Sequence, residues 1–110
     1  RQYFKGKSLD GSCPMGPVIV TADELAELSS LEIETRVNGE LRQSAAVSQM
    51  LFDVATLISV LSDGMTLEPG DILATGTPAG VGDASGRYLQ PGDVVEVRVS
   101  GIGSLATYIV

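Results

Sequence analysis

Apolar and polar side chains alternate along residues 31–37. This period of two is typical of a β-strand with one face toward a core. The segment runs into Asn38-Gly39, a dipeptide that favours a type I′ turn because both central residues of that turn need positive φ. The return segment, residues 40–44, is polar. The pattern therefore predicts a β-hairpin over residues 31–44 that lies at the edge of a sheet.

A second pattern, over residues 48–62, has the spacing of a helix. Ser48 can cap its start, and Asp63-Gly64 is a stop signal. The apolar positions at helical spacing are Leu51, Val54, Ala55, Ile58 and Leu61, and further apolar groups on other faces are Phe52, Leu57 and Val60. A helix that is apolar on most sides is usually covered. We expect this to be the longest helix, buried against the sheet, with contact in a dimer as the alternative.

The last third of the chain reads as strands joined by tight turns. Pro-Gly-Asp occurs at residues 69–71 and again at 91–93, where Pro-Gly sets a turn and Asp can bond the local backbone. Residues 94–99 and 105–110 flank a glycine-containing turn and predict a second hairpin. Earlier in the chain, residues 1–17 are expected to be irregular and residues 21–25 to form a short helical turn. The class is mostly β with minor α (α+β).

Composition narrows the function. The 110 residues include 14 acidic and 7 basic ones, and the net charge of −7 argues against nucleic acid or an anionic membrane as partner. No apolar run is long enough to span a bilayer. Histidine is absent, which removes the commonest general base from this chain. The chain starts at Arg1 and not at methionine, so we expect it to be part of a longer protein.

The stretch from Ile72 to Gly82, ILATGTPAGVG, delivers an apolar run into a glycine-rich loop. A phosphate loop needs Gly-Lys-Ser/Thr followed by a helix, and here residues 83–86 read Asp-Ala-Ser-Gly. We predict no helix over residues 76–86; a helix starting at Gly80 or Gly82 would favour the phosphate loop. Glycine permits close approach of a ligand to the backbone, so a binding loop is favoured over a plain connector.

Other candidates are open to plainer interpretations. Cys13 is expected to be a small buried or half-buried thiol, because no histidine is present to activate it. Glu32 and Glu34 lie on one face of a strand and could chelate a cation, but solvated charges paired with Arg36 explain them as well, and we favour that. Two lysines, at positions 5 and 7, read from physics alone as solvated surface charges.

The segments that carry a family resemblance run through the whole chain. Lys5-Gly6-Lys7-Ser8-Leu9-Asp10 with Cys13-Pro14-Met15-Gly16-Pro17 resembles the Lys-Ser-Phe-Asp…Cys-Pro-Leu-Gly-Pro segment of the fumarylacetoacetate hydrolase family. Similar matches follow in the family's order at residues 37–43, 67–71, 75–82, 89–97 and 101–103. The likeness identifies residues 1–110 as the C-terminal part of a single catalytic domain of this type.

The resemblance implies a mixed β-sandwich roll and a soluble, cytoplasmic, homodimeric enzyme. Its cofactor would be Mg²⁺, with Mn²⁺ or Ca²⁺ as alternatives, and its substrates acylpyruvate-like diketo or enol acids. The implied reactions are C–C hydrolysis, decarboxylation, isomerisation and hydration. Lys7 matches the family's catalytic lysine, which stabilises an enolate. Thr77 and Gly76 match the substrate-binding loop, and Gly11 matches a position whose backbone approaches the metal.

The metal's side-chain ligands and the general base lie upstream of the lysine in the family, so none is expected in this chain. Glu32-Ile33-Glu34 has the spelling of the family's Glu-x-Glu pair, but it precedes the Val-Asn-Gly-Glu hairpin and is not expected to bind metal. The fragment alone is expected to be inactive. The alternative function is a non-catalytic β-rich binding or assembly module that retains the fold.

Overall fold

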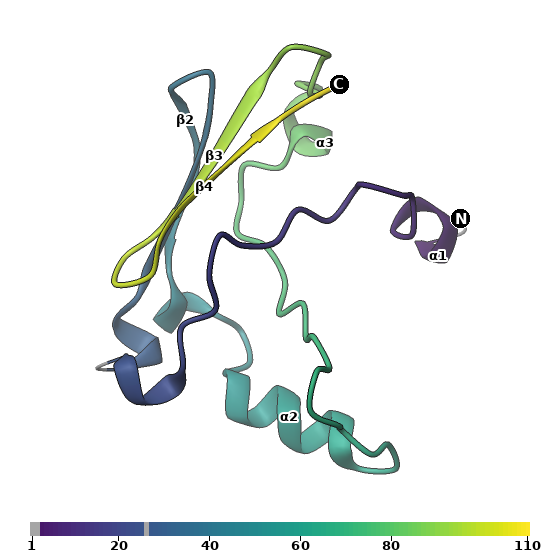
Figure 1. Cartoon of the computed structure of the whole chain (residues 1–110), viewed down its shortest axis with the longest axis vertical. Coiled ribbons are helices and arrows are strands. Elements are labelled where there is room, and N and C mark those ends of the chain that lie inside the picture. Colours follow the sequence, from purple (N-terminus) through teal and green to yellow (C-terminus); the bar gives the residue numbers. More distant parts are fainter. Residues whose placement is uncertain (1–2, 26) are drawn as a thin grey trace.

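A computed structural model describes residues 3–25 and 27–110 (Figure 1). The helices are α1 (Tyr3–Gly6), α2 (Val54–Ser62) and α3 (Gly82–Ser85), and three 3-10 turns are η1 (Ala22–Glu24), η2 (Leu28–Ser30) and η3 (Val47–Gln49). The strands are β1 (Glu32–Val37), β2 (Glu40–Ala46), β3 (Val94–Val99) and β4 (Gly103–Tyr108). None of the described helices has the length and hydropathy to cross a membrane. The mostly β class with minor α is confirmed.

The four strands form one antiparallel sheet in the order β2-β1-β3-β4. The first hairpin turns at Asn38 and Gly39, whose φ angles of 52° and 82° are both positive, as a type I′ turn requires. Its polar return strand β2 occupies the edge, as predicted. A bulge opposite Thr35 and Arg36 shifts the register of β2. The second hairpin, β3–β4, is also confirmed.

Strand register divides the sheet into a charged face and an apolar face. On the charged face, Glu34 pairs with Arg98 and Arg36 with Glu96 across β1 and β3. The alternate positions on the other face pair apolar residues, among them Ile33 with Val99 and Val97 with Leu105. The alternation of apolar and polar residues in the sequence therefore reflects a strand with one apolar and one charged face, as predicted.

The longest helix differs from its prediction at its start and in its surroundings. It begins at Val54 because Asp53, not Ser48, is its N-cap: Asp53 Oδ1 accepts from the Thr56 amide at 2.7 Å. Ser48 lies within η3. None of the residues of α2 is buried, and Figure 1 shows the helix below the sheet rather than on it. The predicted burial of this helix against the sheet is therefore wrong for the described chain.

Two short helices lie where none was predicted. The α3 turn starts at Gly82, so the prediction of no helix over residues 76–86 is wrong; it ends one turn later, at Gly86 in the left-handed region with φ 69°. A single turn without a following lysine, and with Asp83 in its first turn, lacks what a phosphate loop needs. The α1 turn lies in the segment expected to be irregular.

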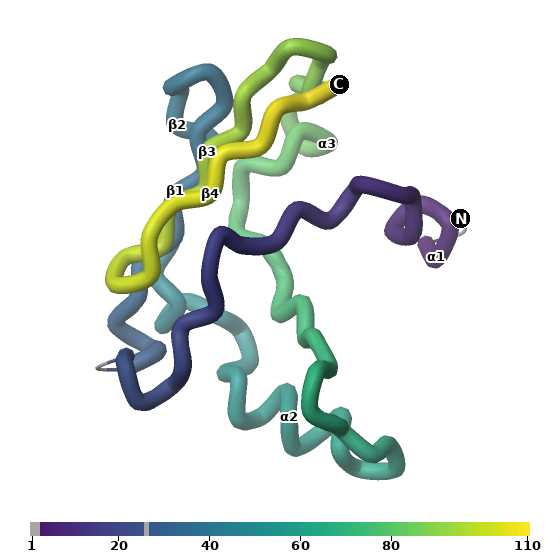
Figure 2. The backbone as a smooth tube through the Cα atoms, viewed as in Figure 1, coloured from purple at the N-terminus to yellow at the C-terminus, as the bar shows by residue number. Residues whose placement is uncertain are grey.

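The described chain has almost no core of its own. Leu31, 9% exposed, is its one buried apolar side chain, whereas 22 large apolar side chains are exposed. Figure 2 shows that the backbone after α1 and the backbone between α2 and α3 run as extended tubes and not as packed helices or strands. Apolar side chains of the sheet such as Val97 and Leu105 are only half-buried.

Candidate functional site

The loop that carries Thr77 is held against the edge strand by one side chain, Gln43 of β2. Its amide nitrogen Nε2 donates to Thr77 Oγ1 at 3.0 Å and to the Pro78 carbonyl at 3.0 Å. A longer contact, 3.4 Å, reaches the Ala79 carbonyl. Gln43 faces the loop because the β2 bulge lies next to it in the strand. These bonds attach the loop to the edge strand of the sheet.

The glycines of this loop have different reasons to be glycine. At Gly80, with φ +103°, an added Cβ would collide with the carbonyl oxygen of Arg42, so this glycine lets the loop approach the strand. At Gly76, with φ +112°, an added Cβ would meet nothing within 4 Å. Part of the glycine content is therefore explained by packing against β2, and Gly76 is the position that leaves open space.

Gly76 and Thr77 line a hollow with apolar walls. The walls come from β1, β2, η3 and the start of α2, including Ile33, Ala45, Met50, Phe52 and Leu57. Ser44 and Gln49 add polar atoms at its edge. A few polar groups in an apolar concavity are typical of sites for small organic molecules. Gly76 and Thr77 therefore both contribute to the lining of this hollow.

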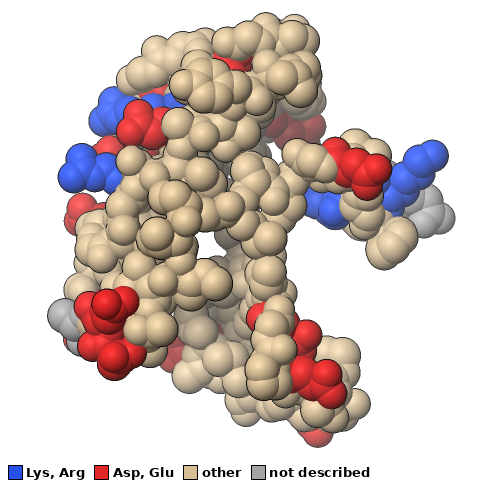
Figure 3. All heavy atoms as spheres, in the orientation of Figure 1, with Lys and Arg blue, Asp and Glu red and all other residues tan. Residues whose placement is uncertain are grey.

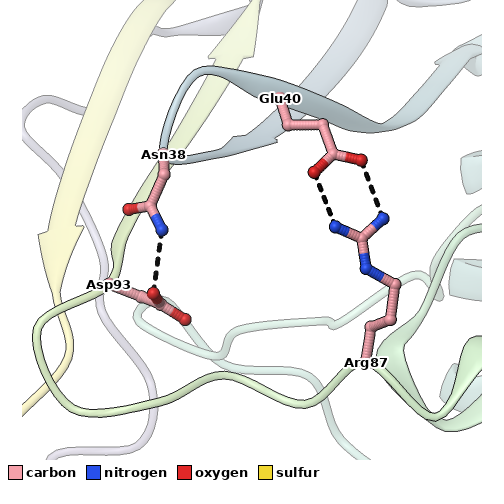
Figure 4. Close-up of polar contacts among 4 residues, drawn as sticks. All are labelled: Asn38, Glu40, Arg87 and Asp93. Atoms are coloured by element: carbon pink, nitrogen blue, oxygen red, sulfur yellow. Dashed lines mark hydrogen bonds and ion pairs between the residues drawn. The ribbon is translucent and has the colours of Figure 1, made fainter.

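Two further contacts anchor the chain that follows this loop (Figure 4). Arg87 makes a bidentate ion pair with Glu40 at 2.7 and 2.6 Å, and Asn38 Nδ2 donates to Asp93 Oδ1 at 2.8 Å. The hydrogen bonds from Arg87 hold the pKa of Glu40 below its ordinary value. The Gln90 amide, and then Asn38, lower the pKa of Asp93. The hairpin therefore positions residues 77–93 at three points along its edge.

Lys7 and Gly11 lie elsewhere. Lys7 is exposed and closes the α1 turn, its amide donating to the Tyr3 and Phe4 carbonyls at 3.1 Å. Figures 1 and 3 show α1 on an arm that reaches away from the sheet and carries charges of both signs. Gly11, with φ +68°, lines a second hollow between this arm and β3–β4. In the described chain the four predicted site residues are spread over three places.

The described residues do not fit a metal site by themselves. Residues 3–25 and 27–110 include no group of three or more His, Cys, Asp or Glu side chains placed to hold an ion. Glu34 instead pairs with Arg36 at 3.4 Å, the pairing that was expected. Cys13 is exposed, and the expectation of a buried or half-buried thiol is wrong, because its extended segment is not covered by another described element.

Gln43 is the site residue that sequence reasoning missed. A glutamine on a polar edge strand reads as a solvent-facing residue, and its partners lie 34 to 36 positions further along the chain. No period or local motif carries such a contact. Arg42 was missed as well: its carbonyl faces Gly80, and its Nε is buried without a partner among the described residues.

Comparison with known proteins gives a consistent set of relatives. The family model described as fumarylacetoacetate (FAA) hydrolase C-terminal matches residues 1–110. Oxaloacetate tautomerase YisK of Bacillus subtilis is 51% identical over 111 residues, which cover 99% of this chain and 37% of that protein. The chain therefore spans little more than a third of the length of this curated relative.

Solved structures agree with the sequence matches. A fumarylacetoacetate hydrolase from psychrophilic Exiguobacterium antarcticum superposes with a TM-score of 0.93 at 55% identity, over 98% of this chain and 39% of that one. A maleylpyruvate hydrolase from Sphingobium sp. SYK-6, in complex with manganese (II) ion and pyruvate, superposes with a TM-score of 0.82 at 39% identity, over 89% and 35% of the two chains.

Proposed function

Because this chain belongs to the fumarylacetoacetate hydrolase family, we propose that it supplies the C-terminal part of a divalent-metal-dependent enzyme acting on acylpyruvate-like keto or enol acids. The observation that carries the proposal is the Gly76-Thr77 loop, which lines an apolar hollow and is attached to β2 through Gln43. A hydroxyl, an open backbone and apolar walls suit an acid with a polar head and an organic tail.

Each predicted site residue has a role in this proposal. Thr77 binds an oxygen of the acid, and Gly76 lets the acid come close to the backbone. Lys7 places an ammonium where negative charge develops on the enolate, which stabilises a transition state more than a ground state. Gly11 offers a backbone oxygen near the metal.

The cation itself is part of the proposal, with Mg²⁺ or Mn²⁺ as candidates. A divalent cation bound by the two oxygens of an α-keto acid acts as a Lewis acid. Because the described residues form no carboxylate cluster, its side-chain ligands would come from outside this chain. The manganese and pyruvate of the Sphingobium maleylpyruvate hydrolase support both the cation and the ligand class.

The names of similar proteins indicate which type of reaction to propose. Oxaloacetate tautomerase, maleylpyruvate hydrolase and 5-carboxymethyl-2-hydroxymuconate delta-isomerase are names of proteins similar to this chain. Tautomerisation moves a proton between the carbon and the oxygen of a keto acid, and an enolate lies between the two forms. We propose enolate stabilisation as the chemistry of this chain's half of the site.

A homodimer is proposed as the assembly. The apolar side chains Ile58 and Val60 of α2, neither of which lines the hollow, are 45% and 67% exposed. Such a surface is costly to leave in water. A second copy would cover it, and sedimentation of the full-length protein measures whether it does.

The experiment is a turnover screen with the full-length protein. Oxaloacetate and a series of acylpyruvates would be followed by loss or gain of enol absorbance, after chelation and again after adding Mg²⁺ or Mn²⁺. We expect turnover of at least one of these acids, abolished by chelation and restored by metal. A folded protein that turns over none of them in either metal would contradict the proposal and favour a non-catalytic module.

A further inference from the structure

We propose that Gln43 is a positioning residue, which orients the Thr77 hydroxyl as a hydrogen-bond donor to an anionic oxygen of the substrate. This inference rests on the proposed function, since it assigns Thr77 a keto acid as ligand. Gln43 lies within the matched segment 37–43 but is not one of the predicted site residues, and its role follows from the hydrogen bonds around Thr77.

The orientation of the Gln43 amide is determined by its partners. Both the Pro78 carbonyl at 3.0 Å and the Ala79 carbonyl at 3.4 Å can only accept hydrogen bonds. The amide nitrogen must therefore face the loop, and the amide oxygen must point away from it. The usual ambiguity between the two ends of a glutamine side chain does not arise where two carbonyls surround one end.

The direction of the Thr77 hydroxyl follows from that orientation. The amide nitrogen has only hydrogens to offer, so at the 3.0 Å contact the Thr77 oxygen is the acceptor. A hydroxyl that accepts here keeps its own hydrogen for another partner. Thr77 is exposed and lines the apolar hollow, so that hydrogen is available to a molecule bound there. A carboxylate or enolate oxygen is the acceptor that strengthens such a bond.

The backbone around the pair limits its freedom. Gly80 lies so close to the Arg42 carbonyl that any side chain at Gly80 would collide with it. The chain is thus fixed on β2 at residue 42 and at residue 43, and Thr77 is separated from Gly80 by only two residues. A hydroxyl held in this way loses little orientational freedom when it binds a ligand, which is the advantage of preorganisation.

The first variant is Gln43→Glu in the full-length, metal-loaded protein. A carboxylate at this position accepts the Thr77 hydrogen and repels the two carbonyls, so Thr77 no longer donates to the substrate. We expect the KM for the keto acid to rise about tenfold or more, with kcat changing less than about threefold. Gln90→Glu is the matched control, because it makes the same charge change at an exposed residue that lines neither hollow, and should leave KM unchanged.

A double-mutant cycle separates positioning from folding. If Gln43 acts through the Thr77 hydroxyl, Gln43→Glu should change KM by less than about twofold in a Thr77→Val background. Gln43→Met, which removes the donors without adding charge, should raise KM in the native background and not in Thr77→Val. Melting temperatures of all variants identify any that fail to fold.

The outcomes are distinct. An undiminished effect of both Gln43 variants in the Thr77→Val background would mean that Gln43 only supports the fold, and would overturn the inference. If Thr77→Val raises KM but neither Gln43 variant does, the inference is overturned as well. The proposed function is not contradicted by that result. A wild-type protein that turns over no keto acid is instead the failure of the proposed function.

Discussion

Lys5 and Lys7 offer a matched pair of side chains, two residues apart and both exposed at the α1 turn. If Lys7 stabilises an enolate, Lys7→Met keeps most of the side chain's bulk and removes its charge. We expect turnover by the full-length protein to fall at least ~100-fold, as loss of a preorganised charge does elsewhere. The melting temperature should barely change, since an exposed lysine contributes little to stability.

Lys5→Met is the control for that experiment and should leave turnover nearly unchanged. Steady-state kinetics of both variants against one keto acid, at saturating metal, provide the comparison. Equal and small effects at the two positions would mean that Lys7 is an ordinary surface lysine, and the catalytic assignment would fall.

Glu32 and Glu34 raise the question of which carboxylates hold the metal. Glu34 is paired with Arg36 at 3.4 Å on the charged face of the sheet and has Arg98 as its neighbour across β3. A carboxylate engaged in this way, as that of Glu34 is, makes a poor ligand for an ion. We expect the double variant Glu32→Gln, Glu34→Gln to keep its activation by Mg²⁺ within about twofold in the full-length protein. A metal titration that no longer saturates in this variant would reverse the assignment.

The N-terminus of α2 has two candidate capping residues, Asp53 in the structure and Ser48 in the prediction. Asp53 accepts a hydrogen bond from the Thr56 amide, and hydrogen bonds from the Thr56 side chain and then its amide lower the pKa of Asp53. Ser48 lies in the preceding η3 turn. We expect Asp53→Ala to lower the melting temperature of the full-length protein by roughly 2–4 °C. Ser48→Ala should lower it by clearly less. A larger effect at Ser48 would mean that the helix starts earlier than the structure has it.

The contacts that tie residues 87–93 to the first hairpin should make stability depend on pH. Hydrogen bonds from Arg87 lower the pKa of Glu40 from 4.5, and the Gln90 amide and Asn38 lower that of Asp93 from 3.8. A lowered carboxyl pKa means that the folded state binds fewer protons, so stability is present above the ordinary value and is lost as pH falls through the lowered one.

We therefore expect the melting temperature to fall as the pH drops below about 4.5, and to fall less steeply in Glu40→Gln, which has no charge there to lose. Calorimetry across that range makes the comparison. Parallel profiles for the two proteins would show that the Glu40–Arg87 pair, 55% and 53% exposed in its side chains, adds nothing to stability.

The two hairpins were predictable because their causes are local. A few adjacent residues determine both the alternation along β1 and the turn at Asn38 and Gly39, where φ is positive. The start of α2 was not predictable, because apolar residues at helical spacing continue on the N-terminal side of the cap at Asp53. The α3 helix was not predictable either, because a single turn is too short to show a helical period. The Gln43–Thr77 contact could not be predicted from local patterns, because it joins residues that are 34 positions apart in the sequence.

At the scale of the whole molecule, the described chain exposes far more apolar side chains than it buries, which is unusual for a folded domain. Leu31 is its one buried apolar side chain among the described residues, and the chain covers 37% of the length of a relative with 51% identity. A core this small supplies little of the burial that stabilises a domain. The candidate site is equally dispersed among the described residues: Gly76 and Thr77 line one hollow, Gly11 lines another, and Lys7 lies at the α1 turn.

The most direct measurement is a crystal structure of the full-length protein with Mn²⁺ and pyruvate. We predict that Lys7 Nζ and Thr77 Oγ1 both lie within hydrogen-bonding distance, about 3.2 Å or less, of oxygens of one metal-bound pyruvate, with Gln43 Nε2 still donating to Thr77. Pyruvate bound to the metal with Lys7 in solvent, or with Thr77 turned toward the protein, would contradict the account.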